Sequence, residues 1–120
     1  MKMTLKGEDA KKFLKNVEPE WKAFWFHMGA AVKNMREFER ELRKSSERTF
    51  RHHVTSAKND FSIWTKDVIG DQMLAESLKA VKTAKEAADK VEKRIAELET
   101  AVKKLADAAA KEAKKRSAKK

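Results

Sequence analysis

The chain has 120 residues, a formal net charge of +10 and no cysteine. This length corresponds to one domain, and the absence of cysteine excludes disulfides, thiolate nucleophiles and Cys-ligated metal sites. No apolar run approaches the roughly 18 residues of a membrane span, and no hydrophobic stretch follows the N-terminal lysines. We therefore expect a cytoplasmic protein without a membrane-spanning segment or a signal peptide.

The aromatic residues are confined to the first part of the chain. All nine lie before residue 65, whereas the last 56 residues are rich in Ala, Lys and Glu and contain none. This asymmetry predicts a mainly α-helical protein in which a small helical head, residues 1–71, precedes one long coiled-coil-like helix. That helix is expected over residues 72–116, followed by a disordered basic tail over residues 117–120.

The stretch KGEDAKKFLKNVEPE predicts a short first helix. Its apolar positions share one helical face and are Ala10, Phe13, Leu14 and Val17. Pro19 ends the helix, because proline disfavours helical backbone in the preceding residue. The next stretch, WKAFWFHMG at 21–29, fits a strand, an extended strap or a helical turn. We expect its aromatics to lie in the core, although such side chains can also stack on nucleic-acid bases.

Capping signals predict the next two helices. Asn34 stands three residues before Glu37, a capping-box-like pattern, and the helix that it begins should end near Lys44. Ser45 or Ser46 then caps a short helix that buries Phe50 and Val54.

A helix–loop–helix comes next, in the segment TFRHHVTSAKNDFSIWTKDVIGD. Asn59 is a suitable N-cap and Gly70 a suitable residue just after the helix, while Asp71 caps the helix after it. The residues expected at the structural centre of the head are His53, Asn59, Asp60, Trp64 and Asp67.

From residue 72 to about residue 115 there is no Gly or Pro, and apolar residues recur at spacings of three and four. Branched residues at a and Leu at d favour a parallel dimer, with Arg94 facing Glu99 of the partner helix. The expected interface residues are Val81, Ala88, Val91, Ile95, Leu98, Val102 and Leu105. Packing of this helix on its own head, or on a helix of another protein, is the alternative.

Two groups of basic residues are candidate phosphate contacts. The C-terminal group is Lys103, Lys104, Lys111, Lys114, Lys115, Arg116, Lys119 and Lys120, and the second, on one helical face, is Arg36, Arg40, Arg43 and Lys44. The alternatives are a solubilising tail for the first group and intrahelical ion pairs such as Glu39–Arg43 for the second.

No pattern in the chain indicates catalysis. The three glycines are far apart, so there is no phosphate-binding loop, and adjacent His52 and His53 point about 100° apart and do not chelate one metal together. We expect His53 to be a buried, hydrogen-bonded structural residue; an acid–base pair with Asp60 or Asp67 is the alternative. The prediction is no catalytic residue, no metal, no cofactor and no small-molecule substrate.

Part of the chain resembles a family of small archaeal and bacterial domains of unknown function. The shared pattern, FxFxxG…NxxE…FxxHV…NDFxxWxxDVxxDxxLA, covers about residues 24–78. It comprises Phe24, Phe26, Gly29, Asn34, Glu37, Phe50, His53, Val54, Asn59, Asp60, Phe61, Trp64, Asp67, Val68, Asp71, Leu74 and Ala75. The resemblance implies one folded, mainly helical head and supplies no activity. The basic tail is similar in composition to linker-histone tails.

Together these features predict a non-enzymatic protein that binds nucleic acid through phosphates, tolerates many sequences and oligomerises through its long helix. Such a protein would be architectural, and nucleoid-associated if its partner is DNA. The alternative is an oligomeric adaptor whose coiled coil docks a protein partner and whose basic end only solubilises it.

Overall fold

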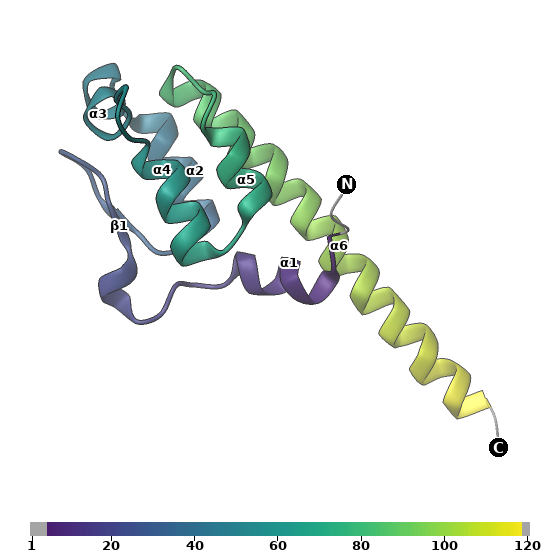
Figure 1. Cartoon of the computed structure of the whole chain (residues 1–120). Helices are drawn as coiled ribbons and strands as arrows, with labels where there is room; N and C mark the ends of the chain where they lie inside the picture. Colours follow the sequence, from purple (N-terminus) through teal and green to yellow (C-terminus); the bar gives the residue numbers. More distant parts are fainter. Residues whose placement is uncertain (1–4, 119–120) are drawn as a thin grey trace.

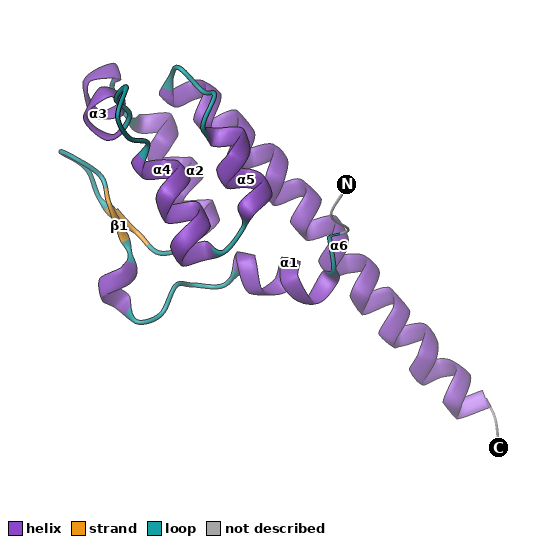
Figure 2. Ribbon diagram, in the orientation of Figure 1, coloured by secondary structure: helices purple, strands orange, loops and turns teal. Residues whose placement is uncertain are grey.

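The structure, a computed structural model, describes the backbone of residues 5–118 and the side chains of residues 5–114. Helices account for most of it, and the only strands among the described residues form one short hairpin (Figures 1 and 2). The elements are α1 (Gly7–Leu14), η1 (Glu20–Lys22), β1 (Phe24–Trp25), β2 (Ala31–Val32), α2 (Met35–Lys44), α3 (Glu47–His53), α4 (Asp60–Trp64), η2 (Thr65–Ile69), α5 (Gln72–Leu78) and α6 (Ala84–Ala118). The mainly α-helical class is confirmed.

Side-chain caps begin α2 and α3 where the sequence predicts them. The Asn34 side chain accepts a hydrogen bond from the Glu37 backbone N–H at 2.8 Å, and the Glu37 carboxylate accepts one from the Lys33 N–H at 3.0 Å. Ser46 caps α3 by accepting from the Thr49 N–H at 3.2 Å. These bonds satisfy backbone donors that have no partner within the helix, so the two predicted starts are confirmed.

The segment from α4 to α5 also agrees with its predicted caps. The Asn59 side chain accepts a hydrogen bond from the Ser62 N–H at 3.0 Å. The chain then widens into the π-helical turn η2, where the Gly70 N–H donates to the Thr65 carbonyl at 2.9 Å, five residues back. Gly70 has a φ of +92°, a left-handed conformation that glycine adopts at little cost. Asp71 then caps α5.

The aromatic stretch at 21–29 combines a short helical turn, a two-residue strand and the hairpin turn that follows the strand. It begins with the short turn η1 and continues as β1, which pairs antiparallel with β2 in the register Phe24↔Val32. We call residues 20–33 the strap. It is held to the helices at its start, because the Trp64 indole N–H donates to the Lys22 carbonyl at 2.8 Å. The first helix, α1, ends at Leu14, earlier than its apolar pattern predicts.

The long helix expected over 72–116 is interrupted, so that prediction was wrong. Helix α5 ends at Leu78, and α6 begins at Ala84 after a turn in which the chain reverses direction (Figure 1). The Thr83 hydroxyl accepts a hydrogen bond from the Glu86 N–H at 3.1 Å and so caps α6. At the far end, α6 continues through residues 117 and 118, which were expected to be disordered; residues 119 and 120 lie outside the described part.

The core joins the head and α6 into one unit. Phenylalanine rings from β1, α2 and α4 pack on one another, with Phe24 and Phe61 centroids 5.4 Å apart. Helix α6 packs across α1 and α2 and closes this core. Its buried apolar side chains and those of the preceding turn are Val81, Ala84, Ala87, Ala88, Val91, Ile95 and Leu98. A domain boundary at residue 71 is therefore wrong, because the head lacks one wall of its core without α6.

Candidate nucleic-acid interface

The end of α6 extends beyond the head as an exposed helix (Figure 1). The last buried residue described is Leu98, and Ala101, Val102 and Leu105 are half-buried. Contact with α1 is close: a Cβ added to Gly7 would lie 2.6 Å from the Leu105 Cβ. Beyond Leu105 every described side chain is exposed. We call residues 103–118 the basic arm.

The basic arm carries four of the predicted phosphate contacts in an exposed position: Lys103, Lys104, Lys111 and Lys114. The side chains of Lys115 and Arg116, and all of Lys119 and Lys120, lie outside the described residues. Alanine-rich sequence favours the helix here, and cations suit its C-terminal end because the helix dipole is negative there. Residues 103–118 contain six basic and two acidic residues, so the arm carries a strong positive charge.

The face of α6 that was predicted to form the coiled-coil interface packs against the head of its own chain. Val81, Ala88, Val91, Ile95 and Leu98 are buried within the core of a single chain. Among the predicted interface residues, this leaves only Val102 and Leu105, both half-buried. A parallel dimer through this face would require α6 to leave its own core, so the interface prediction was wrong. The spacing of three and four reflects packing of α6 on α1 and α2.

Arg94 has a different partner from the one predicted. Its guanidinium reaches back to Asp71, with Nε 2.6 Å from Oδ2 and Nη2 3.0 Å from Oδ1. Both side chains are buried, and Glu97 lies 3.2 Å from the same guanidinium. Glu99, the predicted intermolecular partner, instead contacts Arg36 at 2.8 Å within the chain.

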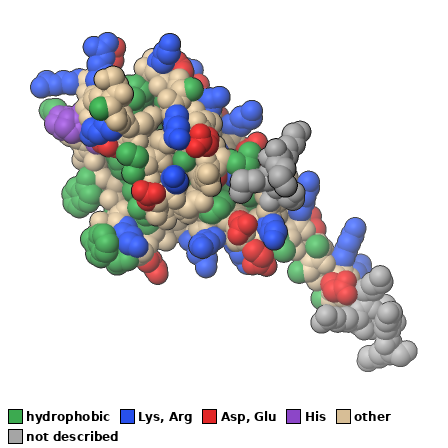
Figure 3. Space-filling view, in the orientation of Figure 1, with side chains coloured by type: hydrophobic (Ala, Val, Ile, Leu, Met, Phe, Trp, Pro, Cys, Tyr) green, Lys and Arg blue, Asp and Glu red, His purple; other side chains and the backbone are tan. Residues whose placement is uncertain are grey.

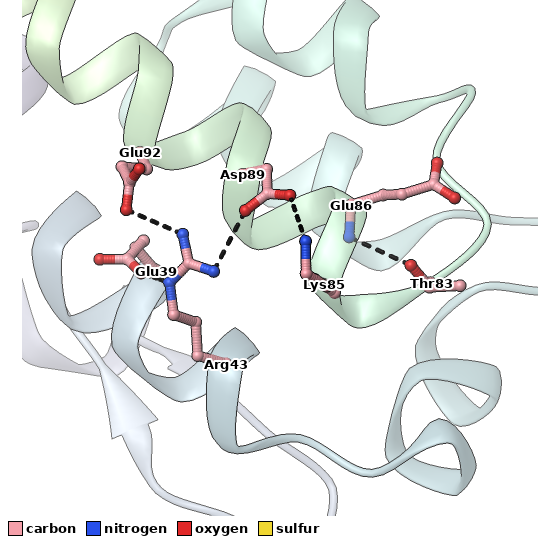
Figure 4. Close-up of polar contacts among 7 residues, drawn as sticks. All are labelled: Glu39, Arg43, Thr83, Lys85, Glu86, Asp89 and Glu92. Carbon is pink, nitrogen blue, oxygen red and sulfur yellow. Dashed lines mark hydrogen bonds and ion pairs between the residues drawn. The ribbon is translucent and has the colours of Figure 1, made fainter.

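The second predicted group of phosphate contacts lies on α2, and we call it the arginine stripe: Arg36, Arg40, Arg43 and Lys44. Carboxylates largely neutralise its charge. Arg43 contacts Glu39 on its own helix, together with Asp89 at 3.1 Å and Glu92 at 2.9 Å on α6 (Figure 4). Hydrogen bonds to Asp89 and Glu39 raise the pKa of Arg43 above its ordinary value. The ion-pair alternative is confirmed for Glu39–Arg43.

Acidic residues beside the stripe weaken it as a phosphate-binding surface. Arg36 contacts Glu99 at 2.8 Å, and the Lys44 amine lies 4.0 Å from Glu41. Arg40 is exposed between them. A shallow groove of about 640 Å³ runs between α2 and α6 here, but Glu39, Glu92 and Glu99 line it with the basic residues. A phosphate would have to displace these carboxylates.

His53 is a buried structural residue, as the sequence predicts. Its Nε2 accepts a hydrogen bond from the His27 backbone N–H at 2.9 Å, and its Nδ1 lies 3.0 Å from Asp60 Oδ2. Nδ1 therefore carries the proton of the neutral ring, and this N–H donates a hydrogen bond to Asp60. Burial lowers the pKa of His53, and the bond to Asp60 opposes this only in part.

This arrangement leaves His53 with no free lone pair for an acid–base step. Burial raises the pKa of Asp60, but hydrogen bonds from Lys58 and His53 together outweigh it and hold that pKa below its ordinary value. Within residues 5–114, no group of three or more His, Asp or Glu side chains is arranged to hold a metal ion. The hydrogen bonds of His53 thus hold α3, α4 and the strap together.

The other predicted residues of the centre have unequal roles. The Asn59 amide donates to the Leu78 carbonyl at 2.9 Å and ties α4 to α5, in addition to capping α4. Trp64 holds the strap through Lys22. Asp67, however, is exposed on η2, so its predicted place at the centre was wrong. The buried carboxylate of this region is Asp71.

The aromatics of the strap divide into two sets. Phe24 and Phe26 are buried, as expected. Trp21 and Trp25 are 76% and 71% exposed, so their predicted place in the core was wrong. Alternation along β1 explains Trp25, because successive side chains of a strand point to opposite faces. The sequence could not distinguish the exposed side chains of the strap from the buried ones, because both sets are aromatic.

No protein-family model, curated protein or solved structure matches this chain. The resemblance of residues 24–78 to a family of unknown function therefore stays a prediction. None of the described helices is long and apolar enough to cross a membrane.

Proposed function

We propose that this protein binds nucleic acid through the phosphate backbone, using the basic arm as its main contact. The observation that carries the proposal is that α6 extends past the head at the point where its charge becomes strongly positive. A rod of cations standing clear of the head can lie along a groove or strand and displace condensed counterions. The described arm has lysines and no base-reading constellation, so binding should tolerate many sequences.

The described contacts leave less surface free to bind phosphate than the two groups of basic residues in the sequence suggested. The stripe on α2 is already paired with Glu39, Asp89, Glu92 and Glu99, so its contribution should be small. The arm has only Asp107 and Glu112 to offset its positive charge. We therefore assign the binding energy to the arm.

The test is a titration of a 20-base-pair duplex at two salt concentrations with matched lysine variants. The arm variant is K103Q/K104Q/K111Q/K114Q, and the control, with the same change in net charge at exposed positions outside the arm, is K66Q/K82Q/K90Q/K93Q. Each phosphate contact adds about 0.9 to the slope of log K against log salt. The arm variant should therefore reduce that slope by up to about 4, and the control should leave it nearly unchanged.

Truncation after Leu105 gives an independent test. It removes residues 106–120, whose described side chains are exposed, and should abolish most of the binding while the head stays folded. Equal weakening by the arm and control variants would show that only net charge matters. Failure of the full-length protein to bind the duplex at low salt would refute the proposal.

A protein partner is the second candidate, in place of the coiled-coil adaptor. It is favoured by the exposed apolar side chains of Trp21, Trp25 and Met28, because exposed apolar clusters mark interaction sites. Copurification of a defined partner with the full-length protein, lost on mutation of the strap and insensitive to salt, would support it over the nucleic-acid proposal.

A further inference from the structure

The outer surface of the strap is an apolar platform. Trp21, Trp25 and Met28 are each more than 70% exposed, and Ala30 and Ala31 beside them are also exposed. Figure 3 shows hydrophobic side chains gathered over the strap at the edge of the head. A tryptophan this exposed loses the burial that usually stabilises it, so two within five residues call for a functional explanation.

Both rings stand on a backbone that is held in place. Trp21 lies in η1, whose ends are closed by hydrogen bonds from the Lys22 N–H and Ala23 N–H to carbonyls three residues back. Trp25 lies in β1 directly opposite Ala31, a small side chain that leaves the ring face open. A backbone held in this way loses little further entropy when a flat ligand stacks on the rings that it carries.

The platform has cations beside it. The Lys22 amine lies 5.5 Å from the centre of the Trp21 ring, and Lys33 is exposed at the end of β2. Exposed Glu18 and Glu20 offset this charge locally. Attraction of phosphates must therefore come mainly from elsewhere, and the platform itself can contribute stacking.

Helix α1 supplies the connection between the platform and the basic arm. It precedes the strap in sequence and packs on α6 near the point where the arm begins (Figure 1). Its exposed cations, and that of the residue after it, are Lys11, Lys12 and Lys15. Exposed Glu8 and Asp9 on the same helix offset part of this charge, so α1 adds a modest net positive charge between the arm and the strap.

We infer that the strap binds single-stranded nucleic acid by stacking unpaired bases on Trp21 and Trp25. The inference rests on the proposed function and deepens it by naming the form of nucleic acid. Exposed aromatic rings beside a basic track are the means by which sequence-tolerant proteins hold single strands, because every base has a flat face. A duplex hides those faces and would use the arm alone.

The test compares a 20-nucleotide oligothymidylate, a 20-base-pair duplex and heparin on full-length protein. The strap variant is W21A/W25A, and the matched control, I63A/M73A, removes two exposed apolar side chains away from the strap. Loss of stacking should weaken single-strand binding roughly 5- to 150-fold per base, with duplex and heparin binding unchanged. The control should bind all three as the unaltered protein does.

Tryptophan fluorescence gives a readout that does not depend on the variants folding. Trp64 is buried, so the response to a ligand comes from Trp21 and Trp25. Oligothymidylate should quench this emission, and heparin, which has no bases, should not. Quenching by heparin to the same extent would overturn the stacking inference.

The remaining outcomes separate the two proposals. Unchanged single-strand affinity in W21A/W25A, with weakened binding in the arm variant, overturns the strap inference and leaves the proposed function standing. No binding of any polyanion overturns both. Conversion of a dimer to a monomer by W21A/W25A, or loss of binding to anionic vesicles without loss of oligothymidylate binding, would make the strap a self-interface or a lipid contact and overturn the inference.

Discussion

The buried pair between Asp71 and Arg94 should be the most sensitive polar contact in the fold. Arg94 presents two nitrogens to the two carboxylate oxygens at 2.6 and 3.0 Å, and the side chains are 1% and 8% exposed for Asp71 and Arg94. This pair joins the start of α5 to the first third of α6. Substitution of Arg94→Met keeps the aliphatic stem packed but leaves Asp71 as a buried carboxylate without its counter-charge.

The expected loss for R94M is about 3–5 kcal/mol of unfolding free energy, because removal of one partner strands a buried charge. This is a large share of the roughly 5–15 kcal/mol typical of a domain. Asp71→Asn should cost less. Asparagine caps a helix as well as aspartate does, and Glu97, 3.2 Å away, still faces Arg94. The double variant D71N/R94M should be more stable than R94M alone, since neither charge is then stranded.

Urea unfolding followed by circular dichroism measures these differences. The matched control is Arg36→Met, which breaks the 2.8 Å pair with Glu99 on the surface, where both side chains are about half exposed. Exposed pairs contribute up to about 1 kcal/mol. A loss for R94M no greater than that for R36M would refute the reasoning, as would a double variant less stable than R94M.

Three further predictions concern the core and its pH dependence. Because burial lowers the pKa of His53 below 6.5, the unfolded chain takes up the proton first. The unfolding free energy should therefore fall as the pH drops below about 6.5, and H53Q should flatten that slope in urea titrations at several pH values. L98A should destabilise the protein by about 2–5 kcal/mol without changing its molecular mass in solution. A fall from a dimer mass to a monomer mass would instead support the predicted coiled-coil interface. G7A should cost about 1–3 kcal/mol by thermal unfolding, since its methyl group would clash with Leu105, and no loss would contradict the close packing of α1 on α6.

Local signals predicted the local structure well. The caps at Asn34, Ser46, Asn59 and Asp71 each form the expected hydrogen bond, because a cap depends only on residues within one turn. The break before α6 had a signal of the same kind. Thr83 and Glu86 have the spacing of a capping box, which indicates a helix start. We did not predict that start, because the absence of glycine and proline from 72–115 favoured one continuous helix.

Tertiary partners were harder to predict from the sequence. A spacing of three and four shows that α6 has an apolar face but not whether its partner is another copy or its own head. The ion-pair partner of Arg94 was equally hard to predict, because Asp71 lies 23 residues earlier in the chain. Strap aromatics posed a related problem, since the inward and outward faces of β1 carry the same class of side chain.

Charge along α6 is sorted by what each half contacts. The half that packs on the head carries Asp89, Glu92 and Glu99, which neutralise the arginines of α2. Beyond the head, the helix has little acidic charge to offset its lysines. The sorting leaves the head able to pack against α6 without charge repulsion, and it concentrates the surplus where a polyanion can reach it.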